Sequence, residues 1–407
     1  MTQMNFTYTI TCNTTLTEAI YVDPPPAIPP IYLQGTAIVV YTLLSILTIG
    51  GNALVYLTVF YYMGIATGTN LFIANLAVTD FFVGVLCIPI VLVSDYLLAD
   101  WPFGLFMCKF TSFSQSVFIV CTVYTLIAMS VDRYVAIIYP LHSKLTRKQC
   151  YILIGMLWLF SIIFSLPVYF EMHVIHICFR RDFNGLKEYT QTICQTNGLL
   201  PSIQNIYNIM TLTIIYLIPL CILSVVYIRL GWQLSQSHAP GEAHSQRDAR
   251  IKKSKKKVIK MCSIVVIMFG VCWFPMQLYT NILHPYFNRI FDQKYVPHFY
   301  FACHLMAMSN SCVNPFIYGI MSSKFRAGFL HYWHRFTTSY GSVTDHFRHS
   351  RHTHDSVMLT ASFQKAKRDY KVNLTCNQHT DDTHATQIFP RSTLPLISSI
   401  QRESAYD

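Results

Sequence analysis

Asp80 lies alone in a long apolar segment, because no other Asp, Glu, Lys or Arg occurs at residues 24–94. A buried carboxylate is costly unless hydrogen-bond donors or a cation compensate its charge. Polar residues inside membrane-spanning segments usually have a function. The last long charge-free segment contributes Asn310, Ser311 and Asn314. Oxygen atoms of these types suit a hard cation, and a hydrogen-bonded network with water is the competing interpretation.

Three short motifs lie on separate apolar segments. Asp132-Arg133-Tyr134 ends the third segment, and Cys272-Trp273-Phe274-Pro275 lies in the sixth. Asn314-Pro315-Phe316-Ile317-Tyr318 lies in the last. Each motif is a weak signal when it is taken alone. Their order and their matching depths on successive segments make the combination specific.

Helical spacing places polar groups on shared faces. Gln115 and Arg133 lie about five turns, or about 27 Å, apart on one face, with Thr122 between them. Two other faces consist of His304, Ser311 and Tyr318 in the last segment and of Phe269, Trp273, Gln277 and Thr280 in the sixth. Core packing accounts for the aromatic members. The amides and the imidazole need polar partners in an apolar interior, so they are candidate binding residues.

Long charge-free segments must position these residues. They run over Pro24–Thr79, Phe81–Ser94, Phe110–Val131, Gln149–Phe170, Tyr189–Ile228, Met261–Asn288 and Tyr295–Ser323. A spanning helix needs about 20 mostly apolar residues, which gives one helix near 33–62, one near 71–92 and five more. Hydrophobic residues make up 53% of the 407 residues and charged residues only 12%, about half the share in soluble proteins. We therefore predict an all-α membrane protein, a seven-transmembrane helix bundle.

The positions of Lys and Arg predict the orientation. None precedes Lys109, and most of the 30 lie in segments expected to face the cytoplasm, including the run Lys252–Lys257. The positive-inside rule therefore places the N-terminus outside. The basic run could bind nucleic acid, but it adjoins a span, so anionic membrane lipid and cytoplasmic partners explain it better. We expect a multi-pass protein of the plasma membrane that binds no nucleic acid.

The chain divides into four expected regions. These are an extracellular tail at 1–32, the seven-transmembrane domain at 33–321, a cytoplasmic amphipathic surface helix at 322–335 and a disordered cytoplasmic tail at 336–407. Asn5 and Asn13 begin glycosylation sequons in the outer tail. A third sequon, at Asn373, falls on the cytoplasmic side and is discarded. Histidines in the last region could bind a metal, but a solvated linker is the simpler interpretation.

The longest outer loop carries a hairpin signal. The β-prone runs 173–180 and 189–195 flank Asp182-Phe183-Asn184-Gly185, and Asn-Gly between two such runs strongly favours a hairpin. We expect a two-stranded extracellular β-hairpin that forms a lid over the outer mouth of the bundle.

Four of the 13 cysteines can face the oxidising exterior, namely Cys12, Cys108, Cys178 and Cys194. Cys108 begins the third span, and Cys194 ends the hairpin. A disulfide between these two would hold the lid on the bundle, and we predict this pairing. Cys178 is the competing partner, and it could otherwise pair with Cys12 or remain free.

Over residues 33–333 the sequence resembles the rhodopsin-like G-protein-coupled receptors. The resemblance rests on Gly51-Asn52, Asn75-Leu76-Ala77-Val78-Thr79-Asp80, Trp101-Pro102-Phe103-Gly104, Cys108, Asp132-Arg133-Tyr134, Trp158, Pro219, Tyr227, Cys272-Trp273-Phe274-Pro275 and Asn314–Tyr318. Lys324-Phe325-Arg326 is similar to the start of the family's short surface helix. The resemblance implies a receptor, not an enzyme, that couples to heterotrimeric G proteins. It also implies receptor kinases, arrestin and membrane lipid as partners.

The resemblance also implies roles for individual residues. The implied ligand-binding residues are Gln115, Trp273, Gln277, Thr280 and His304. The residues implied in activation and G-protein coupling are Asp132, Arg133, Tyr134, Tyr227, Phe269, Trp273, Pro275, Asn314, Pro315 and Tyr318. An allosteric sodium ion would lie among Asp80, Thr122, Asn310, Ser311 and Asn314, with a water-filled network as the alternative. No other cofactor is implied.

Some positions depart from the family pattern. Many relatives carry an acid at the inner end of the sixth span that pairs with the arginine, whereas Lys255 stands there in this chain. Arg133 should therefore rely on Asp132, and basal signalling should be appreciable. The last span lacks the lysine that visual pigments need, and Gln115 replaces the aspartate of amine receptors. These two substitutions argue against light and against small amines as the stimulus.

An extracellular peptide is the ligand that the sequence favours. Residues 303–308 and 311–315 are similar to neuropeptide Y-type receptors, which bind peptides ending in an amidated Arg-aromatic pair. Those relatives hold the arginine with an acid where His284 stands in this chain. Substitute acids could be Asp95, Asp100, Glu171, Asp182, Glu188 or Asp292.

Other functional classes are less well supported by the sequence. An orphan or constitutively active receptor with a non-peptide ligand is the main alternative. A transporter would show internal repeats and interrupted helices, a channel would show a pore segment, and neither pattern is present. The sequence also lacks the HExxH, GxSxG and phosphate-loop motifs of common enzymes.

Overall fold

The computed structural model of the chain describes residues 19–21, 29–64, 68–139, 145–180, 188–196, 201–236, 246–283 and 295–338. The chain separates into two units, Met1–Phe336 and Thr337–Asp407, and everything described below belongs to the first apart from the end of one helix. The sequons at Asn5 and Asn13, the position of His284 and the tail beyond residue 338 lie outside the described residues.

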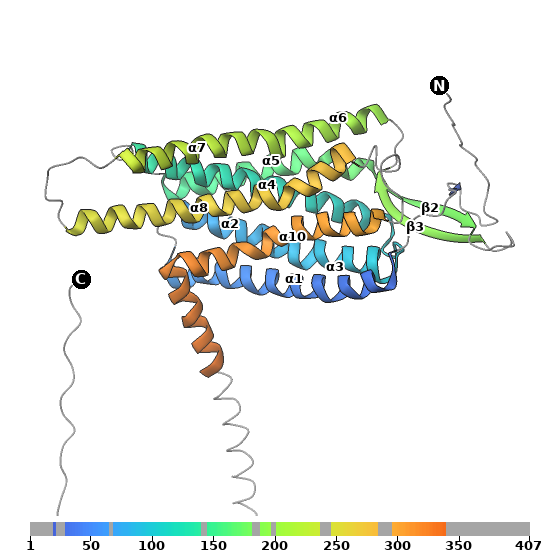
Figure 1. Cartoon of the computed structure of the whole chain (residues 1–407), viewed down its shortest axis with the longest axis horizontal. Helices are drawn as coiled ribbons and strands as arrows, with labels where there is room; N and C mark the ends of the chain where they lie inside the picture. The colour runs from blue at the N-terminus through green and yellow to red at the C-terminus, as the bar shows by residue number, and fades with distance from the viewer. Residues whose placement is uncertain are drawn as a thin grey trace, which may run out of the picture. The chain divides into compact units, whose positions relative to one another are not determined.

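Within the described residues, six helical segments are long and apolar enough to cross a membrane. They are Ile31–Met63, Gly68–Leu97, Gly104–Ile138, Arg147–Glu171, Ile206–Gln233 and Lys256–Asn281. The helix α10 (Val296–Met321) is the seventh member of the bundle (Figure 1). Its inward face carries buried His304, Asn310 and Ser311, and these polar residues lower its hydropathy. The predicted seven-helix architecture is confirmed.

The seven spans are built from these elements: α1 (Ile31–Leu57) with η1 (Thr58–Met63); α2 (Gly68–Phe82), η2 (Val83–Cys87), α3 (Ile88–Val91) and η3 (Leu92–Leu97); α4 (Gly104–Ile138); α5 (Arg147–Glu171); α6 (Pro201–Thr211), η4 (Leu212–Leu217) and α7 (Ile218–Gln236); α8 (Gln246–Leu278) with η5 (Tyr279–Leu283); and α10. The η segments are π-helical turns. Thr146 and Gln149 form a reciprocal capping box at the start of α5, which satisfies backbone donors that the first helical turn leaves unpaired.

The second span is irregular because of a proline. Pro89 lies in α3, and a proline inside a helix removes one hydrogen bond and clashes with the carbonyl four residues earlier. The π-helical turn η2 ends two residues before it and accommodates that clash. A second π-helical turn, η3, follows and carries Asp95 and Tyr96. Such turns are frequent at functional sites.

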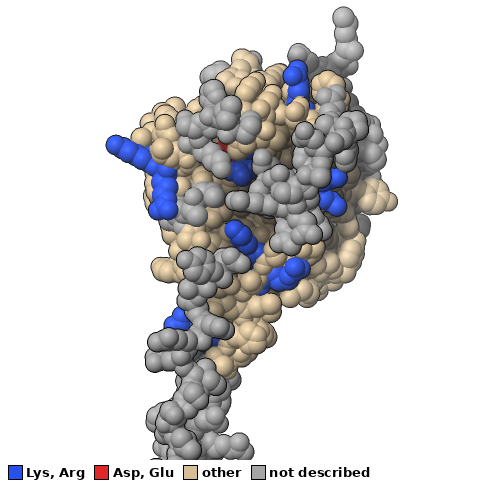
Figure 2. Space-filling view, turned by 90° about the vertical axis from the view of Figure 1, so that its left-hand side faces the viewer, with Lys and Arg blue, Asp and Glu red and all other residues tan. Residues whose placement is uncertain are grey.

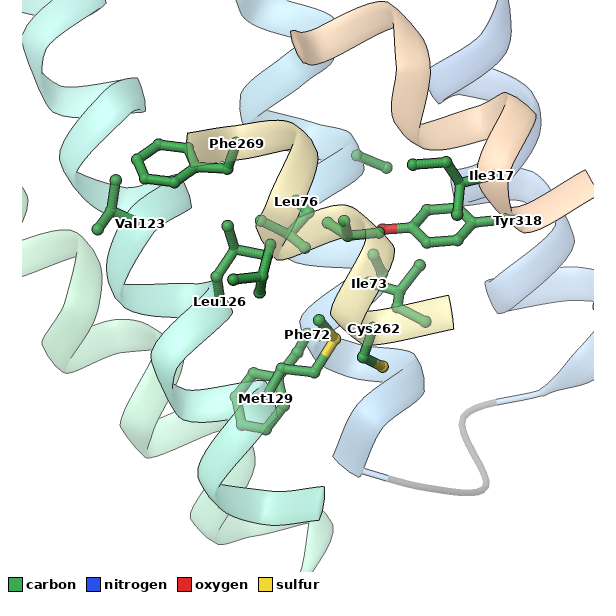
Figure 3. Close-up of a cluster of buried hydrophobic side chains, with 14 of the residues drawn as sticks. Phe72, Ile73, Leu76, Val123, Leu126, Met129, Cys262, Phe269, Ile317 and Tyr318 are labelled. Carbon is green, nitrogen blue, oxygen red and sulfur yellow. The ribbon is translucent and has the colours of Figure 1, made fainter. Parts of the chain in front are cut away.

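The buried interior of the bundle is continuous across four helices. Figure 3 shows Phe72 and Leu76 of α2, Leu126 of α4, Phe269 of α8 and Tyr318 of α10 meeting in one apolar cluster. Each of these side chains is at most 2% exposed. Between membrane-spanning helices, close van der Waals packing of such side chains holds the helices together, because lipid is as apolar as the interior. The cluster therefore fixes the relative positions of the helices that carry the sequence motifs.

A small sheet covers one end of the bundle. Strands β2 (Met172–Arg180) and β3 (Glu188–Thr196) pair antiparallel, with His176 opposite Thr192. The predicted hairpin is therefore present, although its tip at residues 181–187 lies outside the described residues. A third strand, β1 (Ala19–Tyr21), pairs parallel with β2, so the expectation of two strands was incomplete. With only three residues, β1 is too short to leave a sequence signal.

The two ends of the bundle differ in charge. We call the end that carries β2 and β3 the hairpin end and the opposite end the basic end. Figure 2 looks onto the basic end, where the described ionised side chains are nearly all Lys and Arg. A further helix at residues 323–338 begins there. Its Phe325 is buried and stacks on Tyr318 at 5.3 Å, while Leu330 and Trp333 are exposed.

Candidate functional site

A cavity of about 470 Å³ lies under the sheet at the hairpin end, and we call it the main cavity. Its walls come from the second span, the third span, β3 and the start of α10. The lining includes Ser94, Asp95, Tyr96, Thr111, Ser112, Gln115, Gln191, Thr192, Tyr279, Val296, Pro297 and Tyr300. Ligand pockets usually measure roughly 300–1,000 Å³. The main cavity can therefore hold a small molecule or one end of a peptide.

The lid over this cavity is fastened by a disulfide. Cys108 of α4 and Cys194 of β3 are bonded, with their Cα atoms 5.6 Å apart, as the sequence predicts. Because Cys108 begins the third span and Cys194 lines the main cavity, the bond fixes the height of β3 above Gln115. The side chain of Cys178, the competing partner, lies outside the described part of the structure.

Hydrogen bonds from residues 99–101 hold the same strand. The backbone N–H of Trp101 donates to the Thr192 carbonyl at 2.8 Å, and the Thr192 N–H donates to Asp100 Oδ1 at 2.5 Å. The Gln191 amide donates to the Ala99 carbonyl at 2.6 Å. Ala99 has a φ of 50°, a left-handed conformation that is uncommon for alanine. This strained turn aims two acceptors at β3.

The charge in the main cavity is one-sided. Asp95 and Asp100 line it, and no Lys or Arg occurs among its described lining residues. Ser94 donates to Asp95 Oδ1 at 2.6 Å. Tyr96 and Tyr300 lie within electrostatic range of the same carboxylate. The cavity is thus an acidic and aromatic environment that suits a cationic group.

A second cavity of about 20 Å³ lies deeper in the bundle, and we call it the small cavity. Asp80, Thr122, Asn310 and Ser311 line it together with Gln115 and Trp273. This volume accommodates one water-sized particle. Gln115 lines both cavities, so a single side chain connects the two sites.

The polar groups of the small cavity fit a bound cation. Asn314 does not line the small cavity itself, but its Nδ2 donates to Asp80 Oδ2 at 2.8 Å. Within the described structure, Asn314 Oδ1 is buried without a hydrogen-bond partner. A buried acceptor without a donor points to a cation or a water molecule nearby. The hydroxyl of Thr122 already bonds Thr79 at 2.9 Å, so it can offer an oxygen lone pair. One carboxylate with several neutral oxygens suits a hard monovalent cation.

Three residues that the sequence assigns to the ligand line neither cavity. His304 Nδ1 bonds the Tyr41 hydroxyl at 2.7 Å, and its ring stacks on Tyr300 at 5.6 Å. Gln277 accepts a hydrogen bond from Asn281, and exposed Thr280 donates to the backbone of its own helix. Only Gln115 reaches the main cavity, and Trp273 reaches the small cavity.

Sequence reasoning missed the tyrosines of the main cavity. Tyr300 lies one helical turn before His304 on the same face of α10, so periodicity could have identified it. Tyr96 follows Asp95 directly within η3. The π-helical geometry of this turn allows both neighbours to line the cavity, and the sequence carries no signal for that.

At the basic end, Arg133 pairs with its own neighbour. Its guanidinium lies 2.5 Å from Asp132 Oδ2, and this is the single ion pair found in the described part of the chain. Thr69 of α2 also donates to Asp132 Oδ2, at 3.1 Å. The side chain of Lys255 lies outside the described residues. The arginine is thus held by an adjacent carboxylate that is itself fixed to the second span.

Tyr227 lies near this arginine, and Tyr318 lies near Tyr227. The Tyr227 hydroxyl bonds Ser130 at 2.9 Å. Tyr318 is buried, and its hydroxyl has no hydrogen-bond partner within the described structure. A buried hydroxyl without a partner costs about 1–3 kcal/mol. A rearrangement of the helices that gave the Tyr318 hydroxyl a hydrogen-bond partner would therefore be favourable.

The other motif residues lie between the two cavities and the basic end. The ring centroids of Phe269 and Trp273 lie 6.5 Å apart on α8, and both residues precede Pro275. Pro315 contacts the helix α1 so closely that a Cβ on Gly51 would lie 2.8 Å from its ring. Tyr134 contacts Tyr139 at 6.4 Å near the end of the third span. Phe269 belongs to the same buried cluster as Tyr318, Leu126 and Met129, and Trp273 packs against this cluster. The cluster is therefore a packed path from the small cavity toward Arg133.

Comparisons with known proteins agree with this architecture. The chain matches the family described as 7 transmembrane receptor (rhodopsin family) over residues 51–318. It is 33% identical to the RYamide receptor of Drosophila melanogaster over 75% of this chain, and it spans 64% of that receptor. It is 31% identical to the RYamide receptor of Tribolium castaneum, over 78% of this chain and 87% of that one.

A vertebrate relative is similar to the same extent. The chain is 33% identical to neuropeptide FF receptor 2 of Rattus norvegicus, over 71% of this chain and 70% of the relative. The family match at residues 51–318 includes Asp80, Gln115 and Arg133. The chain therefore belongs to the rhodopsin family of seven-transmembrane receptors.

Proposed function

We propose that this chain is a plasma-membrane receptor that binds an extracellular peptide at the hairpin end and activates a heterotrimeric G protein at the basic end. The basic end faces the cytoplasm in this proposal, because Lys and Arg concentrate on the cytoplasmic side of membrane proteins. The relatives named above are receptors for RYamide peptides and for neuropeptide FF. The main cavity under a fastened lid is the observation that carries the proposal.

The ligand we propose is a peptide with an amidated C-terminus. Gln115 lines the main cavity and can both donate and accept hydrogen bonds. A neutral carboxamide offers the complementary donors and acceptors, whereas a free carboxylate offers acceptors alone. The two acids of the cavity also disfavour a carboxylate through like-charge repulsion. The amidated end therefore lies against Gln115, above Trp273.

Binding would reach the basic end through the packed path of motif residues. Gln115 connects the main cavity to the small cavity, where Trp273 lies beside the helix kink at Pro275. A ligand shifts the receptor toward activity only if it binds the active arrangement more tightly. The buried Tyr318 hydroxyl would gain a partner in such a rearrangement. Arg133 would then be free to contact the G protein.

A sodium ion in the small cavity would oppose this change. Asp80 would supply the charge, and Thr122, Asn310, Ser311 and Asn314 would supply neutral oxygens. A bound sodium ion supplies positive charge that holds the carboxylate and the last span together. Receptor kinases and arrestin at the basic end, and anionic lipid along the exposed face of residues 323–338, complete the proposed partners.

The experiment that tests the peptide proposal compares amide and free-acid ligands. Synthetic peptides ending in Arg-Tyr-amide and Arg-Phe-amide are assayed with their free-acid forms on native receptor. The amide should bind at least tenfold more tightly, which corresponds to about 1.4 kcal/mol. The preference should shrink in Gln115→Ala, because the polar partner of the amide is lost.

Gln277→Ala is the matched comparison. It removes the same functional group from a residue that lines neither cavity, so it should reduce the amide preference less than Gln115→Ala does. Equal affinity for amide and acid on the native receptor would contradict the assignment of Gln115. Activation by a small amine or a lipid, with no response to either peptide, would contradict the proposal that the ligand is a peptide.

A further inference from the structure

Among the described residues, Asp95 of the main cavity has no ion-pair partner. Ser94 is the hydrogen-bond donor that the described structure gives it, and the ion pair of the described residues lies elsewhere, at Arg133. An ionised carboxylate in a partly apolar cavity is stabilised by a cation that shares the site. The second oxygen of Asp95 is therefore available to a positively charged group from outside the chain.

Aromatic rings form the wall beside this carboxylate. Tyr96, Tyr300 and Trp101 line the same cavity. Packing fixes the Tyr96 ring, because its centroid lies 5.6 Å from that of Tyr41 and 5.5 Å from that of Phe301. A guanidinium group is planar, stacks on aromatic faces and binds carboxylates through paired donors. An acid beside a fixed tyrosine wall consequently suits arginine better than a strongly hydrated lysine ammonium.

Asp100, the other acid of the main cavity, already has a structural task. Its Oδ1 accepts the backbone N–H of Thr192 at 2.5 Å, which fixes β3. Among the other acids near this end, Glu171 does not line the cavity. The side chains of Asp182, Glu188 and Asp292 lie outside the described residues. The described geometry thus separates Asp95, which lines the cavity with Ser94 as its donor, from Asp100, which positions the lid.

We propose that Asp95 binds an arginine side chain of the ligand. This inference rests on the proposed peptide function and adds a second contact to it. Gln115 and Asp95 line one cavity of about 470 Å³, so the arginine and the amidated terminus enter the same space. The arginine therefore belongs to the last few residues of the peptide. The second span, through η3, supplies the negative charge.

The test exchanges arginine for citrulline, which keeps the shape of the side chain and removes its charge. Labelled synthetic peptides ending in Arg-Tyr-amide and Arg-Phe-amide, and their citrulline counterparts, are bound to membranes carrying the native receptor. Arginine should be preferred at least tenfold, which corresponds to about 1.4 kcal/mol. In Asp95→Asn the preference should fall below about threefold, and in Asp95→Glu it should persist.

Asp100→Asn is the matched control. It removes the same charge from the same cavity, and it should weaken both members of a peptide pair while leaving the preference for arginine in place. The preference is a ratio of two affinities on one receptor, so differences in expression cancel. Free-acid peptides are measured in parallel, because the preference for the amide should survive in Asp95→Asn.

Each outcome decides between the two claims. An arginine preference that stays tenfold in Asp95→Asn, or that is missing in the native receptor, overturns the role of Asp95 while the amide preference upholds the peptide ligand. Loss of the amide preference together with the arginine preference in Asp95→Asn indicates a collapsed cavity and overturns the separate role of Asp95. Failure of both amidated peptides to bind the native receptor overturns both claims.

Discussion

At the hairpin end, Asp95 lines the main cavity with a serine hydroxyl as its donor, whereas at the basic end Arg133 is paired with its own neighbour Asp132. In our proposal the charge of Asp95 is neutralised by the arginine of the ligand. The charge of Arg133 is neutralised by the adjacent residue, and Thr69 fixes that carboxylate to the second span. In this proposal the ligand supplies the counter-charge at the hairpin end, whereas the chain itself supplies it at the basic end.

The same contrast applies to the backbone. The lid is fastened by a disulfide and by hydrogen bonds to residues 99–101, so the hairpin end is prearranged. At the basic end the Tyr318 hydroxyl is buried without a partner. A prearranged cavity reduces the entropy cost of binding, and an unsatisfied group favours rearrangement. The comparison predicts different consequences for substitutions at the two ends.

The largest effect should come from Arg133→Ala. We expect G-protein activation to be abolished, with peptide binding and surface expression largely retained, because the guanidinium lies at the end of the bundle opposite the main cavity. Its several donors suit backbone carbonyls and hydroxyls of a partner. Nucleotide exchange on a purified G protein, measured beside peptide binding, separates the two functions.

Arg229→Ala is the matched control, since Arg229 is an exposed arginine near the basic end of α7. It should leave nucleotide exchange within about twofold of native, as most exposed substitutions have small effects. Full activation by well-expressed Arg133→Ala would break the proposed division between a binding end and a coupling end.

An intermediate effect should follow from loss of the disulfide. Cys108→Ser with Cys194→Ser should weaken peptide binding by at least tenfold, or about 1.4 kcal/mol, because β3 would keep only its hydrogen bonds to residues 99–101. Cys221→Ser removes an exposed cysteine of α7 and should leave binding unchanged. Non-reducing peptide mapping of the native receptor provides the direct check.

Recovery of a Cys108–Cys178 peptide in that map would contradict the pairing. Unchanged peptide affinity in the double variant would show that the hairpin end does not depend on a fastened lid, and the contrast between a rigid end and a rearranging end would then be lost.

Sequence reasoning identified the spans and motifs because both depend on local features. A charge-free segment of about 20 residues predicts a spanning helix from length and composition alone. The hairpin followed from Asn184-Gly185 between β-prone runs, and the structure places its strands at 172–180 and 188–196. The helix α10 is less apolar than the others, and the charge-free segment Tyr295–Ser323 still identified it.

The details of the main cavity could not be predicted in the same way. Helical periodicity grouped His304 and Gln277 with other polar residues of their helices, but it could not show which residues would contact each side chain. Tyr41, from the first span, takes up the His304 ring, and Asn281 occupies the Gln277 side chain. Asp95 was one of six candidate acids, and its selection required the π-helical turn η3 and its tertiary neighbours.

The smallest effect should be that of sodium on peptide affinity. If Asp80 holds sodium in the small cavity, replacing potassium by sodium at constant ionic strength should weaken binding of the Arg-Tyr-amide peptide. We expect about a fivefold change, the lower end of usual coupling between two sites, because the ion favours the resting arrangement and acts only through its differential affinity. Asp80→Asn should remove most of the sodium effect, while the peptide affinity measured in potassium should change little in comparison. This result would sharpen the contrast between the ends, since one ion between them would favour the closed basic end and oppose the ligand. Affinity that is insensitive to sodium in the native receptor would leave the small cavity as a hydrogen-bonded water site, with Asn314 Oδ1 satisfied by water alone.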